Sequence, residues 1–125
     1  MPRVLVVDDD LEIRKLLREA FEEAGFEVEV AVDGADALAR YRSHRPDVVI
    51  TDILMPKRSG IELVSTLLRD DRYAQIIAMS GVVGEAFLEA GMELGVKRVF
   101  AKPLEVEVLV NTVRALIEDI SRGVR

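Results

Sequence analysis

The stretch Pro46-Asp47-Val48-Val49-Ile50-Thr51-Asp52 is an apolar run that ends in a carboxylate. Residues 47–51 are rich in β-branched side chains and do not alternate between polar and apolar. They therefore predict a strand that is buried on both faces. Strands of this kind belong to parallel sheets with helices packed on each side. Asp52 is thus expected where a buried strand opens into a loop.

Further strands of the same character alternate with amphipathic helices along the chain. We predict strands at 3–7, 26–32, 47–51, 75–79 and 97–101, and helices at 11–24, 35–43, 60–70, 84–94 and 104–120. The expected inward face of the first helix consists of Ile13, Leu16, Leu17, Ala20, Phe21 and Ala24. Five consecutive βα units predict an α/β fold, a doubly wound (βα)5 domain with a five-stranded parallel sheet.

Size and composition indicate one globular domain of 125 residues, with the fold over 1–120 and a frayed tail or the start of a linker at 121–125. The absence of cysteine excludes disulfides and thiolate metal sites. The net charge of −6 argues against direct binding to nucleic acid. No apolar run approaches the ~20 residues of a membrane span. Met1-Pro2-Arg3 leads straight into a strand pattern, which leaves no room for a signal peptide, so we expect a cytoplasmic protein.

Polar side chains follow four of the five predicted strands. They are Asp8, Asp9 and Asp10 after the first strand, Asp52 after the third, Ser80 after the fourth and Lys102 after the fifth. Because the carboxyl ends of parallel strands meet at one edge of a sheet, these groups are expected in one crevice. Each also has a plain structural interpretation, since the three acids could cap a helix and Lys102 could be a surface lysine. Their joint occurrence at one edge favours a functional site.

This set of groups suits a metal-assisted phosphoryl acceptor. Clustered carboxylates repel one another, and a divalent cation removes that repulsion. Ligation by oxygen alone favours Mg²⁺ or Mn²⁺ over Zn²⁺. Lys102 could then neutralise one phosphoryl oxygen and the Ser80 hydroxyl could donate to another. A carboxylate such as that of Asp52 can itself accept the phosphoryl group as an aspartyl phosphate.

Four motifs, in this order and spacing, resemble those of the receiver domains of two-component response regulators. They are Val6-Val7-Asp8-Asp9-Asp10, Asp52-Ile53-Leu54-Met55-Pro56 with Gly60, Met79-Ser80-Gly81, and Phe100-Ala101-Lys102-Pro103. The resemblance extends from residue 3 to about residue 119 and implies the flavodoxin-like strand order 2-1-3-4-5. It leaves open whether the receiver is free-standing or excised from a longer regulator.

The resemblance implies a role for each residue around the acceptor. Asp52 matches the phosphoacceptor and also a metal ligand. Asp9 matches the direct metal ligand, and Asp8 the acid that reaches the metal through water. The backbone carbonyl of Leu54 matches the third protein ligand. The implied cofactor is Mg²⁺ or Mn²⁺.

A second group of residues matches the phosphate-binding and switching part of the family site. Ser80 matches the switch hydroxyl and Phe100 the switch aromatic, although Phe100 could equally be a plain core residue. Gly81 matches a small residue that leaves room for the phosphate. Lys102 matches the lysine of the family motif, and the Lys102–Pro103 bond is expected to be cis.

A receiver is a signalling switch and not an enzyme, because it promotes only its own phosphorylation and dephosphorylation. The resemblance implies a histidine kinase or a histidine phosphotransfer protein as donor, and a downstream protein or an effector domain outside this chain as target. Phosphorylation is expected to change the face built by the fourth helix, the fifth strand and the fifth helix. We expect a monomer or a phosphorylation-dependent dimer that contacts neither nucleic acid nor membrane directly.

Two other classes of protein share parts of this pattern. Phosphatases of the haloacid-dehalogenase type also form an aspartyl phosphate after a strand, but they need a second acid two residues after the nucleophile. That position here is Leu54. Phosphate-independent interaction modules on the receiver scaffold usually lose an acid or the lysine, whereas this chain retains Asp8, Asp9, Asp52 and Lys102.

Two apolar residues lie beside the expected pocket, Leu54 two positions after the acceptor and Val82 two positions after the switch hydroxyl. Many relatives carry polar side chains at these positions, and such side chains can orient an attacking water. We therefore predict that the aspartyl phosphate of this chain hydrolyses slowly.

We predict that Leu54→Asn and Val82→Glu accelerate dephosphorylation several-fold, because each introduces a side chain that can hold the attacking water. The measurement is the rate of loss of the phosphoryl group after removal of the donor, beside wild type. The hypothesis is wrong if neither variant is faster than wild type.

Overall fold

The computed structural model describes residues 1–53, 59–81, 89 and 91–123 of the chain. Leu54 and Val82 lie outside these residues. The sequence predicted that the Leu54 carbonyl binds the metal and that both side chains affect the lifetime of the phosphate. Most of the fourth predicted helix, 84–94, also lies outside them.

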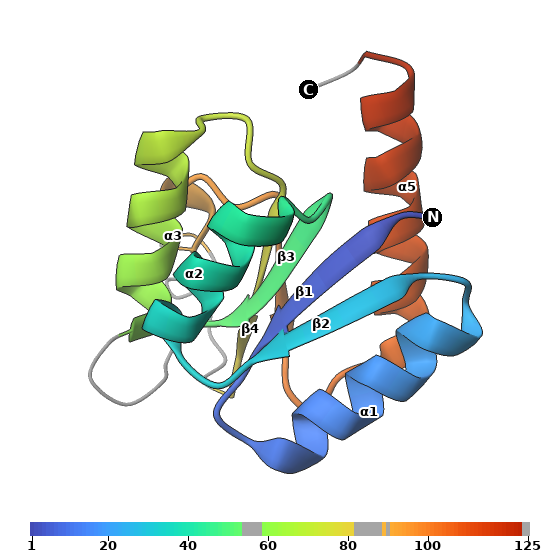
Figure 1. Cartoon of the computed structure of the whole chain (residues 1–125). Coiled ribbons are helices and arrows are strands. Elements are labelled where there is room, and N and C mark those ends of the chain that lie inside the picture. Colours follow the sequence, from blue (N-terminus) through green and yellow to red (C-terminus); the bar gives the residue numbers. More distant parts are fainter. Residues whose placement is uncertain (54–58, 82–88, 90, 124–125) are drawn as a thin grey trace.

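Five parallel strands form one sheet in the centre of the domain (Figure 1). They are β1 (Arg3–Val7), β2 (Glu27–Ala31), β3 (Val48–Asp52), β4 (Ile76–Ser80) and β5 (Arg98–Ala101). Their order is β2-β1-β3-β4-β5, and all four neighbouring pairs are parallel. The predicted doubly wound fold and its strand order are confirmed. Because β1 and β3 are adjacent, their carboxyl ends place Asp8 and Asp52 side by side.

Helices cover both faces of the sheet. The helices with described bounds are α1 (Leu11–Glu23), α2 (Gly34–His44), α3 (Ser59–Asp70) and α5 (Val106–Ser121). Figure 1 shows α1 and α5 on one face and α2 and α3 on the other. Among the helices that the structure describes, none has the length and apolar character that crossing a bilayer requires.

Two apolar cores lie above and below the sheet, because successive strand residues point to opposite faces. Leu5 and Val7 of β1 pack under α2 and α3, whereas Val4 and Val6 pack under α1 and α5. All four are fully buried, as the unbroken apolar strand predicted. The expected burial of Leu16 is wrong, since 45% of it is exposed. It lies at the border of the apolar stripe of α1, whose centre is occupied by the fully buried Leu17 and Phe21.

Arg3 joins several segments at the amino-terminal edge of the sheet. Its guanidinium donates to the Glu27 carboxylate at 3.1 Å and to the His44 carbonyl at 2.7 Å. Its backbone N–H donates to Asp47 at 2.8 Å. Charge-assisted hydrogen bonds therefore connect β1, β2 and the segment between α2 and β3 at this edge of the sheet.

Gly60 allows α3 to pack directly against the end of β3. A Cβ atom at this position would overlap the carbonyl oxygen of Asp52 and would lie 2.6 Å from the Ile53 Cα. Both obstacles are backbone atoms, so a rotamer change cannot relieve the overlap. The absence of a side chain at Gly60 therefore allows α3 to approach the backbone of Asp52, the residue predicted to be the acceptor.

We predict that Gly60→Ala lowers the free energy of unfolding by about 1–3 kcal/mol, the usual range for an overpacked site. Urea unfolding of the metal-free protein measures this loss. Gly81→Ala is the matched control, because a Cβ at that position meets no described atom within 4 Å. Equal stability of the two variants would contradict the close approach at Gly60.

Candidate functional site

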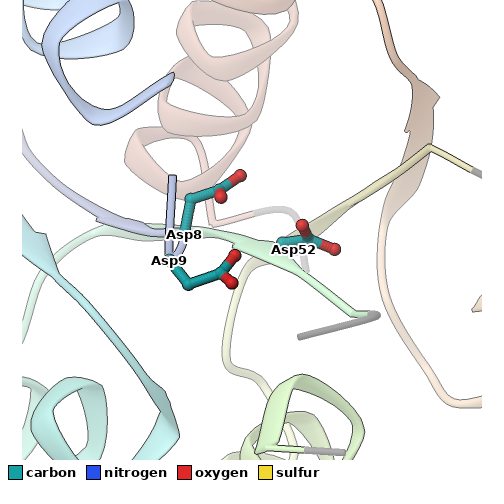
Figure 2. A group of neighbouring side chains, drawn as sticks. All are labelled: Asp8, Asp9 and Asp52. Atoms are coloured by element: carbon teal, nitrogen blue, oxygen red, sulfur yellow. The ribbon is translucent and has the colours of Figure 1, made fainter. Parts of the chain in front are cut away.

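Three carboxylates meet at the carboxyl-terminal edge of the sheet. Asp8 and Asp9 follow β1, and Asp52 is the last residue of β3. Each of the three offers an oxygen, and these oxygens all lie within 4.8 Å of one another. Figure 2 shows the Asp8 and Asp9 side chains next to each other, both projecting toward the side on which Asp52 lies. The sequence therefore located this cluster correctly.

Asp10, the third acid of the run, has a different role. Its side chain accepts a hydrogen bond from the Glu12 N–H at 2.9 Å and caps the amino terminus of α1. The plain interpretation as a helix cap is thus right for Asp10.

Lys102 forms ion pairs with two of the three carboxylates. Its Nζ lies 2.8 Å from Asp8 Oδ2 and 2.9 Å from Asp52 Oδ2. The residue is held at the end of β5 by its own N–H, which donates to the Ser80 carbonyl at 2.7 Å. The Lys102–Pro103 peptide bond is cis. Lys102 is therefore a member of the acid cluster and not a solvated surface lysine.

Burial and mutual contact shift the pKa values of Asp8 and Lys102. Asp8 is fully buried, and this burial raises the pKa of its carboxyl, although bonds from Lys102 and from the Asp10 N–H oppose the effect. The neighbouring charge of Asp52 raises the pKa of Asp8 further. For Lys102, burial lowers the pKa, but the bonds to Asp8 and Asp52 outweigh it and leave the pKa raised. The ammonium is thus charged at neutral pH.

The charge balance and the donor atoms of the cluster fit a divalent cation. Three carboxylates against one ammonium leave two negative charges uncompensated within a small volume. All the side-chain donors are oxygens, which suits Mg²⁺ or Mn²⁺. Asp9 is exposed, so one side of the cluster opens to solvent, where water and a phosphoryl donor could approach.

Ser80, Gly81 and Phe100 belong to β4 and β5 or follow directly, on the side of β3 away from β1. Ser80 is the last residue of β4 and is 1% exposed, whereas Gly81 is exposed. Phe100 lies on β5 opposite Met79 and packs partly buried against the core under α1 and α5. The Phe100 ring therefore contributes to the packing of this core.

Arg14 is a site residue to which the sequence pattern assigned no role. Its guanidinium Nη1 donates to the backbone carbonyl of Asp8 at 2.8 Å. A long polar side chain at the edge of an amphipathic helix usually reads as solvated surface, because the pattern does not specify which backbone oxygen it reaches. No sequence signal would have distinguished Arg14 from Arg18.

The family that the sequence suggested is confirmed by comparison with known proteins. The family model described as the response regulator receiver domain matches residues 4–114. The chain belongs to the receiver domains of response regulators, which are signalling modules of two-component systems. The curated relatives are named as regulators and not as enzymes.

Individual relatives place the chain within that family. The transcriptional regulatory protein PrrA of Mycobacterium tuberculosis is 38% identical over 116 residues, which are 93% of this chain and 50% of PrrA. The chain spans about half the length of the curated relatives it matches. The receiver domain of the Francisella response regulator 1452 is 30% identical, with a TM-score of 0.91 and coverage of 96% of this chain and 99% of that one.

A third similar structure is the CheX-CheY-BeF3-Mg²⁺ complex from Borrelia burgdorferi. It is 31% identical to this chain, with a TM-score of 0.85, and the match covers 93% of this chain and 89% of that one.

We predict that Asp8→Asn stabilises the metal-free protein by about 1 kcal/mol at pH 7.5. The pKa of Asp8 is higher in the folded protein than its ordinary value of 3.8, so its charge opposes folding, and stability falls as the pH rises through the folded pKa. The gain from the amide should therefore be present at neutral pH and vanish on acidification toward 3.8. Urea unfolding in EDTA across this pH range measures it.

Asp10→Asn is the control for this series, because Asn caps a helix as well as Asp does. A loss of stability in Asp8→Asn at neutral pH, or a gain that does not change with pH, would show that burial of the Asp8 charge is not a destabilising element.

Proposed function

We propose that this receiver domain accepts a phosphoryl group on Asp52, with Mg²⁺ or Mn²⁺ held by Asp8, Asp9 and Asp52. The observation that carries the proposal is the cluster of three carboxylates within 4.8 Å, with Lys102 ion-paired to two of them. The carbonyl of Leu54 would be the further protein ligand, although that residue lies outside the described part of the chain. The BeF3 and Mg²⁺ in the related Borrelia CheY complex support the choice of cofactor.

The reaction is a transfer between two carrier groups. A carboxylate oxygen of Asp52 forms a bond with phosphorus while the bond from phosphorus to the imidazole nitrogen of the donor breaks, and the imidazole keeps the electron pair. When bound, the cation would supply charge neutralisation. Lys102 supplies an ammonium 2.9 Å from the acceptor carboxylate, and it can turn from Asp52 to a phosphoryl oxygen while Asp8 continues to hold it.

Phosphorylation would act on the neighbouring strands through Ser80 and Phe100. Ser80 ends the strand beside Asp52, so its hydroxyl can donate to an added phosphoryl oxygen. Phe100 pairs with Met79, the residue before Ser80, and can repack when Ser80 moves. The change would reach the face of the fourth helix, β5 and α5 as a population shift between two packings. Gly81 would leave room for the phosphoryl group.

The partners follow from the class of protein. A histidine kinase or a histidine phosphotransfer protein would donate the phosphoryl group. PrrA, with which this chain shares a receiver, is a transcriptional regulator about twice as long. We therefore propose that the output lies in an effector domain or a separate protein that reads the β5–α5 face, and that the receiver does not itself touch DNA.

We predict that incubation with Mg²⁺ and acetyl phosphate adds one phosphoryl group to the wild-type protein and none to Asp52→Asn, because the amide lacks the nucleophilic oxygen. Intact-mass spectrometry measures the adduct. Asp10→Asn is the matched control, since it removes one charge from the same edge of the sheet and keeps the helix cap.

An undiminished adduct on Asp52→Asn would place the acceptor elsewhere. A wild-type protein that takes up no phosphoryl group from either acetyl phosphate or a phosphorylated histidine donor would instead favour the phosphate-independent interaction module.

A further inference from the structure

All four polar positions of Asp8 are occupied by other parts of the chain. Its N–H donates to the Ala31 carbonyl at 3.2 Å, and its carbonyl accepts from Arg14 at 2.8 Å. Its Oδ1 accepts from the Asp10 N–H at 2.9 Å, and its Oδ2 pairs with Lys102. The N–H pairs with Ala31, the last residue of β2, and the carbonyl follows it where the chain leaves β1. Among the residues that the structure describes, Arg14 is the donor to that carbonyl.

The bond to Arg14 also constrains Asp9. The carbonyl of Asp8 and the N–H of Asp9 belong to one planar peptide unit, so fixing the oxygen fixes the direction in which the Asp9 Cα follows. Within the described residues, the Asp9 carboxylate makes no hydrogen bond of its own. Its place in the cluster therefore depends on its backbone.

We propose that Arg14 is a positioning residue for the cation site: it clamps the Asp8–Asp9 peptide and thereby aims the Asp9 carboxylate at the space shared with Asp52. This inference rests on the proposed function, because the cation site is the one proposed to serve phosphoryl transfer. Arg14 makes no bond to a carboxylate of the cluster among the described residues. It acts through the backbone and is not a ligand.

The charge of Arg14 and its hydrogen bond to Asp8 are expected to change Mg²⁺ affinity in opposite directions. A measurement of Mg²⁺ affinity can therefore test the proposal. As a positive charge near the cluster, the guanidinium repels a cation, so its removal would tighten binding. As a clamp on the metal-binding loop, it improves the geometry of Asp9, so its removal would weaken binding. Hydrogen-bonding partners of metal ligands typically contribute on the order of 10-fold in affinity, which exceeds the effect of a solvent-screened charge.

The experiment measures Mg²⁺ affinity by isothermal titration calorimetry at fixed ionic strength, without any phosphoryl donor. Arg14→Met keeps the length of the side chain and removes its donors and charge, and we expect it to weaken Mg²⁺ binding by about 10-fold. Arg14→Lys keeps the positive charge but replaces the planar guanidinium by an ammonium on a shorter side chain. We expect it to weaken Mg²⁺ binding by an intermediate amount, about threefold. Arg18→Met, the same substitution one turn further along α1, should bind as wild type does.

A second readout requires no metal. In Arg14→Met, amide hydrogen exchange of Asp10 in EDTA should accelerate beyond that of the other loop amides, because its N–H is bonded to Asp8, whose following peptide unit is no longer held. If Arg14→Met does not fold, Arg14→Lys decides alone, since a purely electrostatic role predicts no change and a clamp predicts a loss.

Unchanged or tighter Mg²⁺ binding in Arg14→Met overturns the inference, as does a wild-type protein that binds no Mg²⁺. A protein that binds Mg²⁺ but accepts no phosphoryl group refutes the proposed function and leaves the role of Arg14 standing. The two ideas therefore fail on different measurements.

Discussion

The ion pairs of Lys102 with Asp8 and Asp52 are the interaction on which the rest of the site depends. They connect the carboxyl ends of β1, β3 and β5, which are separated in sequence but converge in a doubly wound sheet. Without the ammonium, three carboxylates would share one small volume and repel one another. With it, the cluster still carries a net negative charge. The cluster of the metal-free protein is thus only partly neutralised and is suited to take up a divalent cation.

The fold tolerates this unfavourable charge because the sheet beneath it is buried and closely packed. The residues of β3 and β4 are buried along their whole length, and two separate apolar cores hold the sheet from both sides. The close approach at Gly60 adds a steric constraint directly at Asp52. Close-packed interiors of this kind do not deform continuously, so a local change at the site is resolved as a choice between discrete packings.

Most of the fold could be predicted because its signals are local. Unbroken β-branched runs predicted the strands, and the spacing of apolar residues predicted the helices, to within two residues for the elements whose bounds are described. The convergence of Asp8, Asp9, Asp52 and Lys102 followed from topology alone. Leu16 was misassigned because a hydrophobic period does not tell how wide a stripe the neighbouring elements cover.

The role of Arg14 was not predicted because it depends on a hydrogen bond to a backbone oxygen, which no side-chain pattern records. Gly60 was noted as part of a motif, but the reason for a glycine at that position is a contact between backbones. Such contacts become visible only once the elements are placed in space.

The bonds that Arg3 makes at the opposite edge of the sheet have a consequence for how the molecule responds to mutation and evolves. Strand β1 begins at the hydrogen bonds that Arg3 makes with Glu27, His44 and Asp47, and it ends at the cluster of carboxylates. We therefore expect fluctuations to be larger at the carboxyl end of β1 than at its amino-terminal end. A fold arranged in this way can change the loops at one edge of its sheet without losing the strands that bring Asp8, Asp9 and Asp52 together.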